Sequence, residues 1–162
     1  MDLKPISREA IPQALEKVER YRLLNEPAEA ESICRDVLRA DPGNARALVM
    51  LLLTLTDQFG SGRGAGVNEA REIIARLEGE YERAYYEGVV FERQGKALLR
   101  TQTAAVGTYG WLQEAMRAYE RAEAVRPAGN DDAILRWNAC ARLLRDRGLG
   151  PRSEDEVEGP IE

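Results

Sequence analysis

The chain has 162 residues, of which 44% are hydrophobic and 31% are charged, proportions typical of a soluble domain with one core. It has no histidine, so neither the commonest general base nor the commonest metal ligand is present. The net charge is −5, and no basic stripe indicates a nucleic-acid partner.

The spacing of apolar residues predicts helices along the whole chain. Apolar positions recur every three or four residues, and no stretch alternates with a period of two, as a strand would. The first helix is predicted to begin near residue 7, or near residue 12 if its first turn is irregular, and to end near residue 24. The second is predicted over 27–40, because Asp-Pro-Gly-Asn at 41–44 stops it.

Five further helices follow in chain order. They are predicted over residues 44–59, 67–80, 82–103, 110–126 and 131–147. Loops are predicted within 59–68, which is rich in glycine, and around 107–110. The glycine-rich loop lacks the spacing of a phosphate-binding motif and follows no strand, so nucleotide binding is not expected.

An internal repeat links the second, fourth and sixth predicted helices. In each, a small residue is followed by a large residue four positions later and a medium-sized one seven positions later. In two of the three, a proline lies twelve positions after the small residue. The residues are Ala30, Cys34, Val37 and Pro42; Ala70, Ile74 and Leu77; and Ala115, Tyr119, Ala122 and Pro127. One helix pair cannot bury its own apolar faces, so repeated pairs are expected to stack.

This pattern resembles the tetratricopeptide repeat, a helical hairpin of about 34 residues with an alanine, large residue and proline signature. The first helices of the pairs match through Val18 and Tyr21; Leu48, Leu51, Leu52 and Leu55; and Gly88, Phe91 and Gly95. The resemblance implies an all-α, right-handed superhelix over 1–148. Its three hairpins would cover about 8–42, 44–81 and 82–127, with a C-terminal capping helix at about 131–147.

Two departures from the repeat pattern fall within the second and third hairpins. Counted from Leu55 to Ala70 and from Phe91 to Ala115, the turns inside these hairpins are enlarged by six and fifteen residues. Enlarged loops at equivalent turns project from one edge of a stack, and they either carry function or reflect tolerated drift.

Residues 149–162 form an acidic tail. The last twelve residues contain five acidic residues, one arginine and few apolar residues, so disorder is expected. The tail either serves only solubility or transiently covers arginines such as Arg93 and Arg142, which would make it a weak internal competitor.

Catalytic chemistry is not expected. No nucleophile has an obvious activator, and no two carboxylates are placed for acid–base work. Cys34 and Cys140 are too far apart for a metal motif and lie in apolar helical patterns, which favours buried thiols in a reducing compartment. We therefore predict a non-enzymatic protein without cofactor or metal.

The expected location is the cytoplasm. The N-terminus shows no apolar signal segment, and the longest apolar run, residues 47–55, is too short to span a bilayer. Only three of the 23 basic residues are lysine, which hints at a GC-rich and hence bacterial genome.

The last predicted helix has more polar residues at its start than the other predicted helices. Asn130 or Asp131 is expected to cap it, and Asp132 and Asn138 are each followed four residues later by an arginine, Arg136 or Arg142. These four side chains either form a polar patch facing a partner or cover the outer face of a capping helix, in which Trp137 closes the core.

The family resemblance implies that the first helix of each pair lines a concave groove that receives a peptide or a helix. The corresponding groove candidates are Leu15, Glu19, Arg22, Val49, Leu53, Asp57, Tyr85, Val89, Glu92, Arg93 and Arg142. The clamp that chaperone-binding members use is missing, because Leu15, Glu19 and Met50 stand at its positions. The alternatives are a homodimer formed through the apolar run and, less favoured, a small-molecule binder.

Overall fold

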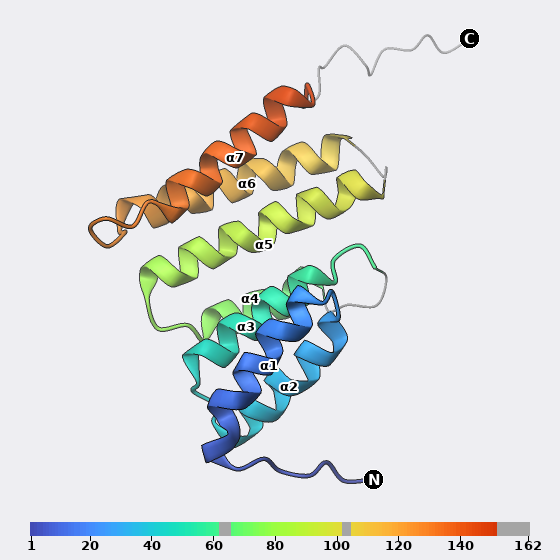
Figure 1. Ribbon diagram of the computed structural model, residues 1–162. Helices are drawn as coiled ribbons and strands as arrows, with labels where there is room; N and C mark the ends of the chain where they lie inside the picture. Colours follow the sequence, from blue (N-terminus) through green and yellow to red (C-terminus); the bar gives the residue numbers. More distant parts are fainter. Residues whose placement is uncertain (62–65, 102–104, 152–162) are drawn as a thin grey trace. The chain divides into compact units, whose positions relative to one another are not determined.

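The computed structural model describes residues 1–61, 66–101 and 105–151, and within these ranges all regular structure is helical (Figure 1). The all-α prediction is therefore confirmed. The elements are η1 (Arg8–Ala10), α1 (Ile11–Leu23), α2 (Pro27–Ala40), α3 (Ala45–Asp57), α4 (Val67–Ala75), α5 (Glu80–Arg100), α6 (Ala105–Ala124) and α7 (Asp132–Asp146). None of the helices in the described ranges is both long enough and apolar enough to cross a membrane.

The chain divides into two compact units, Met1–Arg83 and Ala84–Glu162, each of which is described by itself. The boundary lies next to the predicted start of the third hairpin at residue 82. Whether 1–148 forms one continuous superhelix stays a prediction.

In the first unit, α1 and α2 form a hairpin whose turn depends on Asn25. This residue has φ 59°, a left-handed conformation that asparagine tolerates better than most residues. The Glu26 amide donates to the Tyr21 carbonyl at 2.9 Å, which closes the last turn of α1. The chain therefore reverses directly into α2, whose bounds match the prediction.

The predicted break after α2 is also confirmed. The Asn44 side chain accepts a hydrogen bond from the Ala47 amide at 3.0 Å, so it caps the N-terminus of α3. Its amide group also donates to the Asp41 carboxylate at 3.1 Å. One short polar segment thus ends α2 and starts α3.

The predicted end of α4 at residue 80 is wrong, because α4 ends at Ala75. Leu77 is buried beyond the end of the helix. The Arg83 guanidinium donates to the carbonyls of Leu77 and Glu78, at 2.7 Å each. These side-chain hydrogen bonds, from a residue five and six positions further along the chain, satisfy carbonyls that a longer helix would have bonded internally.

The first unit is held together by apolar packing across α1, α2, α3 and α4. Its core includes Leu15 and Val18 of α1, Ala30 and Cys34 of α2, and a larger set from the later helices. That set is Leu48, Leu51, Leu52, Leu55, Ala70, Ile73 and Ile74. Full burial of Ala30 and Ala70 agrees with their predicted role as small contact residues.

In the second unit, α5 packs closely against α6. A β-carbon built on Gly88 would lie 2.5 Å from the Tyr119 ring, and one built on Gly95 would lie 3.2 Å from the Trp111 β-carbon. Glycine at these two positions lets the larger side chains of α6 approach the α5 backbone. Ala115, on the same face of α6 as Tyr119, is fully buried.

The loop predicted around residues 107–110 is wrong, because these residues belong to α6. The Thr108 side chain is buried and its hydroxyl donates to the Gly95 carbonyl at 3.4 Å. Gly107 lies close to Leu98 of α5. Packing against α5 therefore outweighs the cost of about 1 kcal/mol for each glycine in a helix.

Three predictions fall wholly or partly on residues outside the described ranges. Residues 62–65 belong to the first enlarged turn, and residues 102–104 to the second. Residues 152–162 make up most of the acidic tail.

Candidate functional site

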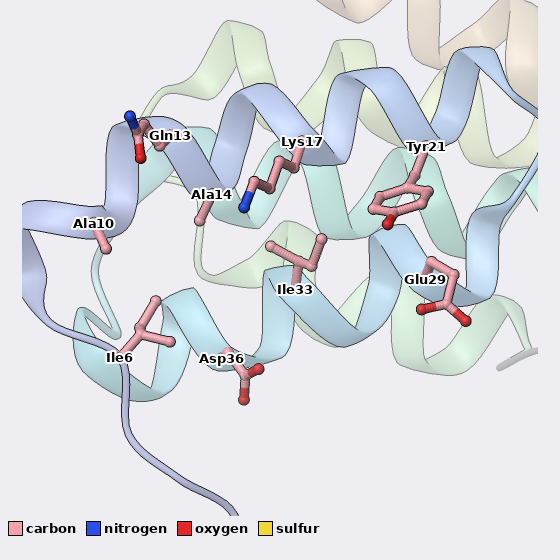
Figure 2. Close-up of a pocket in the computed structure, with 9 residues that line it drawn as sticks. All are labelled: Ile6, Ala10, Gln13, Ala14, Lys17, Tyr21, Glu29, Ile33 and Asp36. Atoms are coloured by element: carbon pink, nitrogen blue, oxygen red, sulfur yellow. The ribbon is translucent and has the colours of Figure 1, made fainter.

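A hollow lies in the first unit, along one edge of the α1/α2 hairpin. It has a volume of about 410 Å³. Its walls come from α1 and α2, and residues before α1 close one end (Figure 2). The lining residues are Ile6, Ala10, Gln13, Ala14, Lys17, Tyr21, Glu29, Ile33 and Asp36. We call this hollow the α1/α2 groove.

Helix periodicity explains why these residues meet. Gln13, Lys17 and Tyr21 of α1 lie four positions apart, and Ala14 is adjacent to Gln13. Glu29, Ile33 and Asp36 of α2 lie three or four positions apart. They form a second stripe on each helix, next to the stripe of Leu15, Val18 and Cys34 that enters the core. Ala14 and Ile33 of this second stripe are partly buried and pack against the core. Figure 2 shows Ala14, Lys17 and Tyr21 of α1 pointing towards Ile33 of α2, with Glu29 and Asp36 at the outer edge of α2.

The α1/α2 groove has an apolar floor and a charged rim. Ala14 and Ile33 lie in its middle, with Ile6 towards one end and Tyr21 towards the other. Lys17 lies on the α1 side, and Glu29 and Asp36 on the α2 side. Within the described part of the chain, none of these three charged side chains makes an ion pair or hydrogen bond.

A smaller recess of about 60 Å³ continues the groove beyond Ile6. It is lined by Lys4, Pro5, Ile6, Asp36, Arg39 and Ala40. The Arg39 guanidinium donates to the Leu3 carbonyl at 3.5 Å, a long contact that ties the N-terminal segment to α2. Positive charge therefore collects at this end of the groove.

The face shared by α1 and α3 is chemically different, because its charges are paired. Arg22 makes a two-pronged contact with Asp57, at 2.7 and 3.3 Å. Arg46 and Glu19 pair at 2.6 Å. These two cross-helix pairs neutralise the charges that the sequence assigned to the first part of a concave groove.

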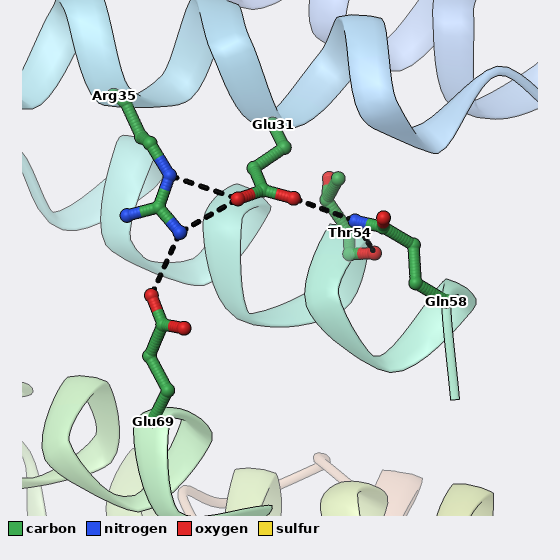
Figure 3. Close-up of polar contacts among 5 residues, drawn as sticks. All are labelled: Glu31, Arg35, Thr54, Gln58 and Glu69. Carbon is green, nitrogen blue, oxygen red and sulfur yellow. Dashed lines mark hydrogen bonds and ion pairs between the residues drawn. The ribbon is translucent and has the colours of Figure 1, made fainter. Parts of the chain in front are cut away.

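A polar network joins α2, α3 and α4 (Figure 3). Glu31 accepts from Arg35 at 2.6 Å and from Gln58 at 2.7 Å, and Arg35 also donates to Glu69 at 2.7 Å. The hydrogen bond to Glu69 is the main cause of the raised pKa of Arg35. The Thr54 hydroxyl nearby is buried and has no hydrogen-bond partner among the described residues. The network braces three helices and leaves no open site.

The second unit contains a buried carboxylate, Glu92 of α5. It accepts a hydrogen bond from the Tyr119 hydroxyl of α6 at 2.6 Å. Arg136 of α7 donates to both of its oxygens, at 3.2 and 3.4 Å, and Lys96 pairs with it one turn along α5. We call these four residues the Glu92 cluster; it joins α5, α6 and α7.

The Glu92 cluster keeps its carboxylate ionised. Burial alone would raise the pKa of Glu92, but hydrogen bonds from Lys96 and Tyr119 and the charge of Arg136 lower it overall. Burial next to this carboxylate raises the pKa of Tyr119 well above its usual value. For Arg136, burial alone would lower the pKa, yet Glu92 and a hydrogen bond involving Tyr85 raise it. Glu92 thus stays ionised while Tyr119 and Arg136 stay protonated. These fixed protonation states suit a structural role better than proton transfer.

Neither cysteine is poised for nucleophilic or metal chemistry. Cys34 and Cys140 are both buried, and burial raises the pKa of each thiol to about 12. Among the described residues, no cluster of acidic and cysteine side chains could hold a metal ion.

The structure separates the predicted groove residues into three kinds of surroundings. Leu15, Val89 and Glu92 are buried in helix packing, so their side chains do not line an open surface. Glu19, Arg22 and Asp57 lie on the paired α1/α3 face. Val49, Leu53, Tyr85 and Arg93 are half-buried, and Arg142 is exposed on α7.

The i, i+4 spacing of polar residues on α7 allows bonds along the helix surface, but Arg136 is used elsewhere. Arg136 reaches across to Glu92, and neither the Asp132–Arg136 nor the Asn138–Arg142 bond occurs in the described part of the chain. Asn130 does accept a hydrogen bond from the Asp132 amide at 3.0 Å at the start of this helix. Trp137 is only partly buried, and its indole donates to Glu120 at 3.0 Å.

Sequence reasoning did not identify the α1/α2 groove. One signal was available, because Ala10, Ala14, Lys17 and Tyr21 form a second small and amphipathic stripe on α1. Its significance depends on the matching stripe on α2, and only the packed hairpin sets the two stripes side by side.

Comparisons with protein-family models, with curated proteins and with solved structures found no match to this chain.

Proposed function

We propose that the chain is a non-enzymatic interaction module that binds an amphipathic helix of a partner protein in the α1/α2 groove. The observation that carries this proposal is the groove itself, an apolar channel of about 410 Å³ whose rim has three charged side chains without an ion pair among the described residues. Helix-in-groove recognition needs this combination of an apolar floor and a polar edge.

The proposal places the partner in the α1/α2 groove, and the family resemblance implied a different groove, lined by the first helix of each pair. On the α1/α3 face, Arg22 and Glu19 already have charged partners, so a ligand would have to displace existing ion pairs. In the α1/α2 groove, Lys17, Glu29 and Asp36 lose no such partner when a ligand binds. Binding there costs less reorganisation.

The finer fold assignment belongs to the same proposal. A tetratricopeptide-like superhelix is supported by three alanines at equivalent repeat positions, Ala30, Ala70 and Ala115, all of which are fully buried. A cytoplasmic, non-catalytic role fits the lack of histidine and the two inert thiols.

Self-association through the apolar run of α3 is the less favoured alternative. Leu51, Leu52 and Leu55 are buried, while Val49 and Leu53 are half-buried. Most of the surface that such a dimer would use is therefore already covered.

The proposal is tested by selecting helical peptides against the full chain from a displayed library of amphipathic sequences. Ala14→Trp fills the middle of the groove, and Glu16→Trp puts the same side chain on the exposed side of the same helix. We expect Ala14→Trp to weaken binding of the selected helices at least tenfold by titration calorimetry, and Glu16→Trp to leave it within about twofold. Selected helices that bind both variants equally would overturn the proposal.

A further inference from the structure

The two walls of the α1/α2 groove differ in charge. Glu29 and Asp36 are seven residues apart on α2, so they lie two turns apart on one side of the groove, about 10 Å along the helix axis. Ile33 lies between them. The α1 wall carries Lys17 and the uncharged Gln13. The α2 wall is therefore acidic.

The dimensions of the groove suit a short helix. The lining residues of the α1 wall extend from Ala10 to Tyr21, which corresponds to about 16 Å, or three helical turns. The small side chains of Ala10 and Ala14 leave room for an apolar ridge between the two walls. Residues at the sides of that ridge would face the charged rims.

We infer that the partner helix carries two basic side chains, seven positions apart, that pair with Glu29 and Asp36 beside its apolar ridge. This inference rests on the function proposed above and adds the chemistry of the partner. Two basic residues seven positions apart on a helix match the two-turn spacing of the carboxylates on α2. Neither carboxylate has an ion-pair partner among the residues that the structure describes, which leaves both available for such contacts.

The two carboxylates are not equivalent. Lys4 and Arg39 line the recess that adjoins Asp36, so positive charge at this end offsets part of the attraction of Asp36 for a basic partner. Among the described residues that line the groove, Lys17 is the one basic side chain that accompanies Glu29. We expect Glu29 to contribute more to the selection of a basic helix than Asp36 does.

Two fluorescent synthetic helices of about 15 residues provide the probe. Both carry the same leucine and alanine ridge; one has two arginines seven positions apart beside it, and the other has two glutamates there. Binding to the full chain is measured by fluorescence anisotropy at low and at high salt. We expect the arginine helix to bind roughly tenfold more tightly at low salt, and the difference to shrink at high salt.

Charge reversal on the protein gives the decisive comparison. Glu29→Lys with Asp36→Lys should reverse the preference and favour the glutamate helix. The matched control, Glu16→Lys with Glu72→Lys, makes the same change in net charge at exposed positions outside the groove lining and should keep the original preference. Of the two single changes, Glu29→Lys should have the larger effect. Circular dichroism checks that every variant folds.

The outcomes separate the inference from the function on which it rests. If both helices bind equally and Ala14→Trp abolishes both, the groove binds helices but the basic-partner inference is overturned. If neither helix binds, the proposed function is overturned together with the inference. If the chain alone forms a dimer in sedimentation that Ala14→Trp dissociates, the occupant is a second copy and the partner assignment is wrong.

Discussion

The Glu92 cluster and the α1/α2 groove are built from the same kinds of side chain but use them in opposite ways. Each contains a lysine, a tyrosine and at least one acidic residue. In the cluster, Gly88 lets Tyr119 come close to α5, and the carboxylate is enclosed by three partners. In the groove, Lys17, Glu29 and Asp36 make no ion pair or hydrogen bond within the described part of the chain, and they lie at the rim beside Ala14 and Ile33.

This difference indicates which charged side chains stabilise the fold and which remain available to bind a partner. Charged groups that are buried and fully paired define the packing of helices, and removing one leaves its partners unsatisfied. Charged groups at an open rim add little stability, so they are free to serve specificity. Substitutions in the Glu92 cluster and in the α1/α2 groove, compared by their effect on the free energy of unfolding, test this difference.

The largest expected effect is that of Glu92→Ala. This change removes the acceptor of Tyr119 and the counter-ion of Arg136, and it should lower the free energy of unfolding by about 2–4 kcal/mol, since Arg136 and Lys96 retain some access to water. Both tryptophans of the chain, Trp111 and Trp137, lie in the second unit. Tryptophan fluorescence in urea therefore measures the stability of this unit.

One control variant and one measurement of pH dependence test the role assigned to Glu92. Glu114→Ala removes an exposed carboxylate that pairs with Arg117 on the same unit and should change stability by less than about 0.5 kcal/mol. Since the folded pKa of Glu92 is lowered, its ionisation stabilises the fold above its unfolded pKa, and this contribution is lost as pH falls through the folded pKa. Glu92→Gln should therefore show a shallower loss of stability in acid than the unaltered chain. An equally steep loss would contradict the assigned role.

A smaller loss is expected for Ala115→Leu. The side chain of Ala115 is fully buried on the α6 face that packs against α5, so a larger residue should overfill the contact that positions Tyr119, at a cost of about 1–3 kcal/mol. The same unfolding measurement applies. Ala124→Leu, at an exposed position of the same helix, is the matched control and should be nearly neutral. A neutral result for Ala115→Leu would mean that the helix register is misassigned.

The smallest effect is expected in the groove. Glu29→Gln and Asp36→Asn remove charges that have no ion-pair partner in the described part of the chain, so each should change the stability of the fold by less than about 0.5 kcal/mol. Circular dichroism in urea, which follows the helices of both units, is the suitable measurement. A loss above 1 kcal/mol would show that these carboxylates stabilise the hairpin and would remove the contrast with Glu92.

Much of the fold could be predicted because the signals are local. The bounds of α2 follow from Pro27 at its start and the Asp-Pro-Gly-Asn sequence after it, and the Asn44 cap follows from the same short segment. The burial of Ala30, Ala70 and Ala115 follows from their repeated spacing. These features depend on a few neighbouring residues or on a simple period.

The errors arose where side-chain contacts with a neighbouring helix compete with local preference. Gly107 and Gly110 indicated a loop, yet packing of Thr108 on α5 keeps them helical. α4 ends early because Leu77 is buried and the Arg83 side chain takes over the carbonyls that follow. In both cases the deciding contact joins residues that the local pattern does not connect.

The sequence by itself determined an all-helical chain, the break between α2 and α3, and the small residues at which helices meet, because these depend on backbone geometry and periodicity. Only the tertiary structure decided that Glu92 is enclosed by Tyr119 and Arg136, and that a second stripe on α1 meets a second stripe on α2. A helix presents several faces, and which of them is buried, paired or left open depends on the helices that pack beside it.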